Sequence, residues 1–124
     1  MLTSAHTYLI YCMAARFYIR YEEEVIAFIA SLEQVPRRQV ERDLEKLASR
    51  GLEALPPLTG NLHGPIWELR SKVEGHGLYR IFYYRDGIRS FHAFYPYQKK
   101  DERLPARVRA EVLKRYEEIT WRQP

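Results

Sequence analysis

The sequence predicts an α+β domain in which one antiparallel sheet carries helices packed on one of its sides. Between residues 64 and 95, three short runs rich in aromatic and β-branched residues are separated by glycine-bearing turns at 74–77 and 85–87. This pattern is typical of a three-stranded meander. Three other stretches carry apolar residues at steps of three and four, which predicts helices. Since an apolar helical stripe must be buried, the sheet is the expected partner of these helices.

Length and composition indicate a single domain with a core of its own. The chain has 124 residues, of which 46% are hydrophobic, and this is enough to bury a core without disulfides or a structural metal. It has one cysteine, Cys12, so no internal disulfide can form and a reducing cytoplasm is the expected location. No apolar run reaches the ~18 residues that a membrane span needs. We expect a domain over residues 13–124 after an N-terminal extension, residues 1–12, with Met13 as an alternative start.

The N-terminal half predicts one strand and then a helical hairpin. Residues 16–21 alternate apolar and basic side chains, as a half-buried strand does. Three glutamates follow, and acidic residues favour the first turn of a helix, which is expected over residues 22–32. Pro36 suits the first turn of a second helix, and Gly51 suits its C-terminal cap. Residues 52–61 contain two adjacent prolines and are predicted to form a connector.

Alternation along the meander assigns its side chains to two faces. In the first strand Arg70 faces away from Trp67, which we expect in the core. The same rule places Arg80 and His92 so that they can gather with Arg70 on one side of the sheet, while Tyr95 falls on the other. Both faces carry aromatic residues, so either face can be the buried one.

The C-terminal part predicts a loop and a last helix. Residues 95–103 are mostly polar and carry a proline, which favours a loop. Pro105 suits the start of a helix whose apolar face contains Val108, Val112 and Ile119.

Positive charge is concentrated in the half of the chain that contains the meander. Residues 1–60 hold 7 Lys and Arg against 8 Asp and Glu, whereas residues 61–124 hold 13 against 8. A basic surface that also presents aromatic side chains suits a polyanion such as RNA.

Residues that carry chemistry are basic or aromatic and lie in this basic half. The sequence has no phosphate-binding glycine loop, no zinc-ligand spacing and no nucleophile elbow, so we expect neither a metal nor a cofactor. The remaining candidates are Arg70, Lys72, Arg80, His92, Tyr95, Tyr97, Lys99 and Lys100. Such a set can cleave RNA when a base activates the 2′-hydroxyl, arginines stabilise the phosphorane and an acid protonates the leaving oxygen.

Each candidate also has a purely structural interpretation. Lysines on an exposed face, such as Lys72 or Lys99, are more often solvated surface residues. His92 lies in an apolar strand and is more often a hydrogen-bonded core histidine than a catalyst.

Several spaced segments resemble the signature of a known toxin family. These are GPIWELR at 64–70, YRIFY at 79–83, FHAF at 91–94, the lysine pair at 99–100, and Pro105. Together they resemble HigB-type toxins of the RelE/ParE toxin–antitoxin superfamily, in its phage-derived toxin-like branch. The resemblance covers about residues 16–116, although four residues separate Phe94 from the lysine pair where the family usually has one.

The resemblance implies a RelE-like fold and a toxin that cleaves mRNA at the ribosome. It also implies a cognate antitoxin, commonly a helix-turn-helix protein. Carried over by position, the catalytic residues are Arg70, Arg80, His92, Lys99 and Lys100, and the RNA-binding residues are Lys72, Tyr95 and Tyr97. Arg70 and Arg80 are expected to bind the phosphate, His92 or Lys99 to transfer a proton, and Tyr95 or Tyr97 to stack on a base.

Two other functions remain open within the superfamily. ParE-type members share the fold and inhibit DNA gyrase without cleaving RNA. A degenerate member binds only its antitoxin.

Overall fold

The structure, a computed structural model, describes residues 17–54, 56–99 and 103–122. Its elements are β1 (Tyr18–Tyr21), α2 (Glu23–Ser31), α3 (Gln34–Arg50), the short 3-10 helix η1 (Gly51–Glu53), β2 (Thr59–His63), β3 (Ile66–Val73), β4 (Gly77–Gly87), β5 (Ser90–Lys99) and α4 (Ala106–Arg122). The extension 1–12, Met13 and Lys100 lie outside the described residues. The described helices include none that is long and apolar enough to cross a membrane.

The five strands form one sheet in the order β1-β5-β4-β3-β2. The meander of β3, β4 and β5 is confirmed, and the sheet is extended at both edges. At one edge β2 pairs antiparallel with β3, although the sequence predicted only a connector up to residue 61. This strand was missed because Pro56 and Pro57 argue against regular structure, yet β2 begins at Thr59, only two residues after Pro57. At the other edge β1 pairs parallel with β5.

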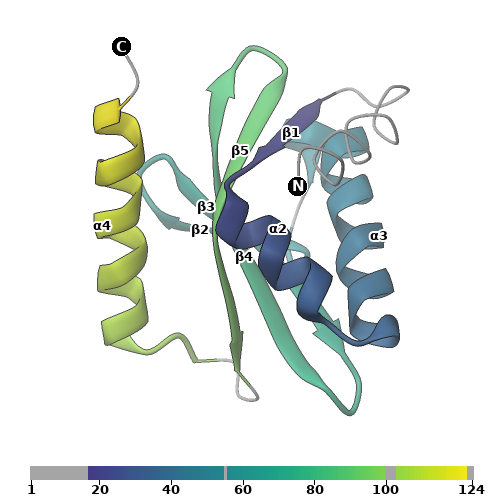
Figure 1. Ribbon diagram of the computed structural model, residues 1–124. Helices are drawn as coiled ribbons and strands as arrows, with labels where there is room; N and C mark the ends of the chain where they lie inside the picture. Colours follow the sequence, from purple (N-terminus) through teal and green to yellow (C-terminus); the bar gives the residue numbers. More distant parts are fainter. Residues whose placement is uncertain (1–16, 55, 100–102, 123–124) are drawn as a thin grey trace.

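The helices cover both faces of the sheet rather than one. Of the described α-helices, α2 and α3 lie on one side and α4 lies on the other (Figure 1). The prediction that all helices pack on one side is wrong, because both faces of the meander carry large apolar residues. Each face needs a helix to bury its apolar side chains, which are Phe82 and Phe94 on one face and Ile81 and Phe91 on the other.

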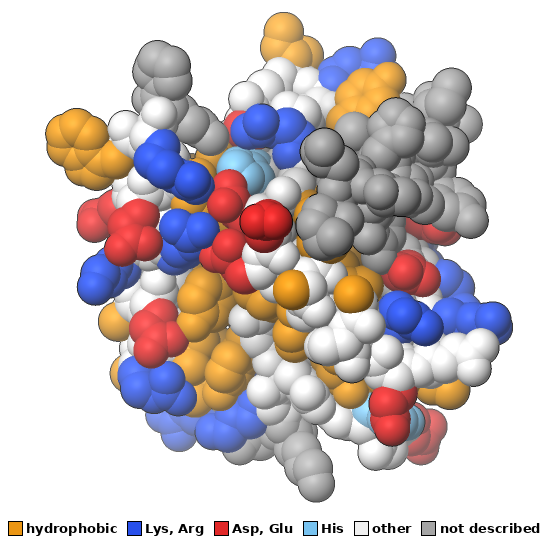
Figure 2. All heavy atoms as spheres, in the orientation of Figure 1, with side chains coloured by type: hydrophobic (Ala, Val, Ile, Leu, Met, Phe, Trp, Pro, Cys, Tyr) orange, Lys and Arg blue, Asp and Glu red, His pale blue; other side chains and the backbone are white. Residues whose placement is uncertain are grey.

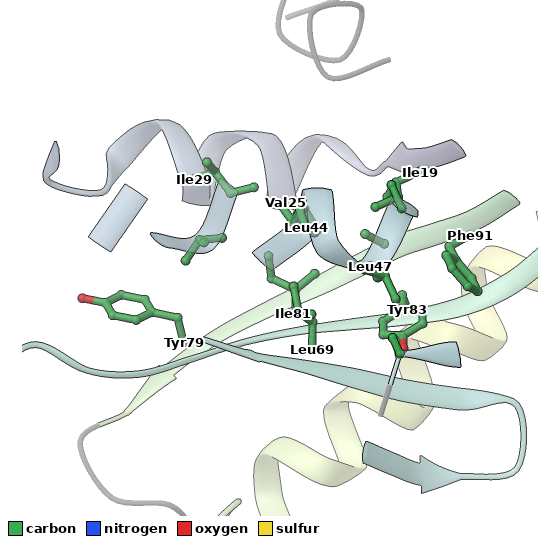
Figure 3. Packing of buried hydrophobic residues seen from close by; sticks show 14 of the residues in the cluster. Ile19, Val25, Ile29, Leu44, Leu47, Leu69, Tyr79, Ile81, Tyr83 and Phe91 are labelled. Carbon is green, nitrogen blue, oxygen red and sulfur yellow. The ribbon is translucent and has the colours of Figure 1, made fainter. Parts of the chain in front are cut away.

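The larger core lies between the sheet and the hairpin of α2 and α3. Val25 and Ile29 of α2 and Leu44 of α3 point at Ile81 and Leu69 of the sheet (Figure 3). Each of these side chains is at most 2% exposed. Fully burying one such side chain contributes roughly 1.5–3 kcal/mol, so this layer fixes the hairpin on the sheet.

A buried polar contact fixes α3 against β3 inside this layer. The Ser71 hydroxyl of β3 donates to the Asp43 carboxylate of α3 at 2.7 Å. Gln39 and Lys46, one turn away on either side, also contact that carboxylate. The helix ends at Arg50 and is capped by Gly51, whose φ of 59° and close approach to the Phe17 ring leave no room for a side chain.

A β-bulge near the middle of β5 changes which face its side chains occupy. Phe82 of β4 faces Tyr95, whereas the next residue, Tyr83, faces Ala93, so Phe94 is an extra residue in β5. Phe94 and Tyr95 therefore both lie on the α4 side. The prediction that Tyr95 lies on the face opposite the arginines is wrong for this reason. The loop predicted from residue 95 is also wrong up to residue 99, since β5 continues to Lys99.

Candidate functional site

Two arginines predicted from the sequence lie side by side on the α4 face of the sheet. Arg70 of β3 pairs with Arg80 of β4, and Arg80 pairs with Tyr97 of β5. The bulge places Tyr97 in this row, because without the extra residue its side chain would point to the other face. Arg80 is 3% exposed, whereas the Arg70 side chain is 37% exposed. Arg70 is thus the arginine that a ligand meets first.

The next row on this face carries two of the predicted lysines. Lys72 of β3 and Lys99 of β5 both face Leu78 of β4, two residues from the arginine row along each strand. Both lysines are exposed. The structure therefore brings Arg70, Arg80, Lys72 and Lys99 together on one face.

A carboxylate that the sequence did not assign to the site lies between the arginines. Glu68 is 6% exposed. Its Oε2 accepts a hydrogen bond from Arg70 Nη2 at 3.0 Å, and its Oε1 lies 3.1 Å from Arg80 Nε. One negative charge is therefore shared by two guanidinium groups, which hold the carboxylate in place and leave the trio with a net positive charge.

The trio lines a groove of about 1050 Å³ that continues to the C-terminal half of α3. We call it the basic groove. Its described charged residues are the cations Lys46, Arg50, Arg70, Lys72 and Arg80 and the acids Asp43, Glu53 and Glu68. Lys46 and Arg50 were not predicted. Their spacing of four residues on α3 places them on one helical face, but only the fold shows that this face borders β3.

Gly60 of β2 determines where the Arg70 head group lies. A Cβ added at Gly60 would lie 2.6 Å from Arg70 Nη2 and 3.0 Å from its Cζ. The guanidinium therefore rests against the β2 backbone, and any larger residue at position 60 would displace it.

The two candidate tyrosines differ in how firmly α4 holds them. The Tyr95 hydroxyl donates to Glu111 of α4 at 2.6 Å, and burial together with Glu111 raises the pKa of Tyr95 to about 12. Its ring also packs against Phe82 at a centroid distance of 6.2 Å. Tyr97 is half-buried and pairs with Arg80, so it is the tyrosine that lies in the row of the arginines.

His92 lies on the same face as the arginines but in a different cluster. Tyr84, the residue of β4 opposite His92, is four residues beyond Arg80, or ~13 Å along the strand. His92 Nε2 lies 2.9 Å from the Glu22 carboxylate, and Nδ1 lies 3.0 Å from the Tyr84 hydroxyl. These neighbours fit a neutral ring that donates from Nε2 and accepts at Nδ1. Burial and the nearby Arg20 lower the pKa of His92, and Glu22 and Asp86 only partly oppose this.

The His92 cluster continues as an ion network that connects α4 to the start of α2. Arg115 of α4 donates to Glu24 at 2.7 Å and to Glu22 at 3.3 Å, and Arg122 also contacts Glu22. Figure 2 shows acidic and basic side chains side by side on this surface between α4 and α2. The network fixes α4 and is separate from the basic groove.

Comparison with known families assigns the chain to one of them. A family model described as "Phage derived protein Gp49-like (DUF891)" matches residues 27–117. The chain therefore belongs to the Gp49-like phage-derived family, which is a toxin-like family of the HigB/RelE type. The observed fold is broadly RelE-like, as predicted. Membership of this family implies an antitoxin partner. A search of curated proteins gave no match.

Proposed function

We propose that this protein is the toxin of a toxin–antitoxin pair and that it cleaves mRNA in the basic groove. The observation that supports this proposal is the Arg70–Glu68–Arg80 trio, which lines a groove whose described charged residues include more cations than acids. Phosphate binding favours arginine, and RNA cleavage through the 2′-hydroxyl needs a base beside the cations.

In this proposal Arg70 binds the scissile phosphate. Its guanidinium is partly exposed, stays protonated, and can pair with two phosphate oxygens. Arg80 lies beneath it, holds the Glu68 carboxylate and adds positive charge that stabilises the phosphorane. Lys72, Lys46 and Arg50 attract the neighbouring phosphates.

Glu68 acts as the general base of the proposed reaction. Its carboxylate takes the proton of the 2′-hydroxyl as the 2′-oxygen attacks phosphorus. The bond from phosphorus to the 5′-oxygen breaks, and Lys99 gives that oxygen a proton. The products are a 2′,3′-cyclic phosphate and a 5′-hydroxyl. His92 has a structural role in this scheme, since it is 5% exposed and lies in the other cluster.

The remaining parts of the proposal follow from the family resemblance. The substrate is mRNA in translation at the ribosome, Tyr97 or Tyr95 stacks on a base, and Lys100 contributes a further cation. The antitoxin is a helix-turn-helix protein.

Induction in a bacterium tests the proposal. The wild-type chain should arrest growth and produce mRNA fragments with new 5′ ends inside translated codons. Glu68→Gln should abolish both effects, because the amide cannot accept the proton, and Arg70→Ala should do the same. Lys114→Gln is the matched control, since it removes an exposed cation of α4 outside the groove.

Two results would contradict the proposal. If Glu68→Gln and Arg70→Ala remain as toxic as the wild type, the groove is not the site. If growth stops with intact mRNA and altered DNA supercoiling, the protein acts as a gyrase inhibitor.

A further inference from the structure

We propose that a second pocket, on the opposite face of the sheet, binds one nucleobase of the RNA strand whose phosphate lies in the basic groove. This inference rests on the function proposed above. It assigns a role to Trp67, which the sequence placed in the core but which is 39% exposed.

The pocket has a volume of about 530 Å³ and is built mainly from apolar and aromatic side chains. Trp67 of β3 forms part of its wall, and Tyr83 and Phe91 are buried residues that line it. Phe91 is held by the Phe17 ring, which stacks on it at 4.7 Å, and by Tyr83 at 5.1 Å. The aromatic lining is therefore fixed before any ligand arrives.

The pocket exists because the helical cover of this face stops early. Helix α3 ends at Arg50, and Gly51 turns the chain away. Gly51 and Leu52 line the pocket next to the end of the helix. Near this point Trp67 is 39% exposed and Leu52 is 61% exposed. Its size falls within the ~300–1000 Å³ that is usual for small-ligand sites.

The pocket lies beside the basic groove. Pro56 lines both. Gly60 of β2 lines the pocket. The Arg70 guanidinium, which lines the groove, occupies the space where a Cβ of Gly60 would lie. A phosphate bound to Arg70 is thus separated from the pocket by the single strand β2, so one RNA strand that passes over this edge can contact both.

The chemistry of the pocket favours a nucleobase. A flat indole wall binds any base by stacking, whatever its hydrogen-bonding pattern. Arg85 lines the same pocket, and its guanidinium is held by the carbonyls of Gly87 and Ile88. A fixed cation beside an aromatic wall suits a base that is attached to a phosphate. An apolar side chain from a protein partner would gain nothing from Arg85 or from the neighbouring basic groove.

Binding of short RNA to the full chain tests this inference. The probe is a 2′-O-methyl pentanucleotide, which cannot be cleaved, together with five versions that each lack one base. We expect one abasic version to bind roughly 5- to 150-fold more weakly, as stacking energies of single bases imply. In the Trp121→Phe background Trp67 is the only tryptophan, and its fluorescence should be quenched by the intact probe but not by that abasic version.

Variants separate the pocket from the groove. Trp67→Ala should make the intact and abasic probes bind equally, whereas Trp67→Phe should keep most of the difference. Arg70→Ala should weaken both probes by a similar factor. Quenching of Trp67 fluorescence in the Trp121→Phe background needs no substitution at position 67, so this readout locates the base even if Trp67→Ala does not fold.

Three results would overturn the inference. If all abasic probes bind like the intact one and Trp67 fluorescence does not change, the pocket binds no base, although RNA binding in the groove stands. If Trp67→Ala leaves RNA binding unchanged and weakens the complex with an antitoxin, the pocket receives a protein side chain. If the wild-type chain binds no RNA, the proposed function fails together with this inference.

Discussion

Arg70 and Arg80 face each other across β3 and β4, and both contact one carboxylate, that of Glu68. Of the two, only Arg70 is substantially exposed, while Arg80 is buried. A bound phosphate would therefore contact Arg70 directly. The buried Arg80 would act on it only through its positive charge and through the Glu68 carboxylate that Arg80 holds in place. We therefore expect substitution of Arg70 to affect phosphate binding directly and substitution of the buried Arg80 to affect it indirectly.

Arg70→Ala should weaken RNA binding in a salt-dependent way. A residue that contacts one phosphate contributes about one unit to the slope of log affinity against log salt. We expect the slope to fall by ~0.7 for single-stranded RNA. Arg70→Lys should keep the slope but lose affinity, because an ammonium cannot pair with two oxygens. Fluorescence anisotropy across a range of salt concentrations measures both, and an unchanged slope in Arg70→Ala would show that this residue contacts no phosphate.

Gly60→Ala should impair the site with little effect on folding. The new Cβ would lie 2.6 Å from Arg70 Nη2, so the guanidinium must move, but it is the end of a flexible side chain. Gly60 has no positive φ, which means that alanine causes no backbone strain there. We expect a change in the free energy of unfolding below ~1 kcal/mol, since few other contacts change. RNA affinity should nevertheless fall toward that of Arg70→Ala. Normal binding by Gly60→Ala would contradict the position assigned to the Arg70 head group.

Arg115→Ala should destabilise the fold more than the loss of an ordinary surface cation. Arg115 is 26% exposed and bridges α4 to Glu22 and Glu24. We expect a loss of about 1–2 kcal/mol, reduced by added salt because part of it is a screened charge interaction. Arg107→Ala is the control, since its pair with Glu111 lies four residues away on the same helix and is more exposed. Its expected cost is below ~0.5 kcal/mol. Urea denaturation of both variants measures the difference, and equal losses would show that the bridge contributes nothing special.

His92 should make the fold less stable as the pH falls below the histidine range. Its pKa is lowered from the usual 6.5, so the folded protein resists a proton that the unfolded chain accepts. The resulting stability is present above pH 6.5 and is lost as the pH falls toward the lowered pKa. His92→Gln should flatten this part of the curve of unfolding free energy against pH.

His63→Gln is the control for that experiment. His63 is exposed in β2, so this variant makes the same substitution at a histidine outside the His92 cluster. A His92→Gln curve that keeps the wild-type slope below pH 6.5 would show that His92 is not the group responsible.

The sequence predicted those features that depend on neighbours along the chain. Alternation in β3 and β4 placed Arg70 and Arg80 on one face, and periodicity identified α2, α3 and α4 with their correct order. Features that depend on pairing between distant segments were missed. The bulge at Phe94 leaves the local pattern of β5 unchanged, and it can be seen only when β4 is laid beside it.

The composition of the site illustrates the same limit. Alternation already put Glu68 on the face of Arg70, but nothing in the sequence showed that Arg80 would meet the same carboxylate. Likewise, Trp67 is a large apolar residue of the kind expected in the core. Its exposure follows from the end of α3 at Arg50, which the strand pattern does not show.

The extra residue in β5 also constrains how this chain can change length. Before Phe94, the strand contributes Phe91 and Ala93 to the layer under the helical hairpin, and after it, Tyr95 and Tyr97 belong to the opposite layer. Deleting a single residue at this point would move the side chains at the end of β5 to the opposite faces of the sheet. Tyr97 would then point away from the arginines. The number of residues at the bulge thus determines the face of the sheet on which the side chains at the end of β5 lie. Insertions are therefore accommodated far more easily in the turns than at the bulge.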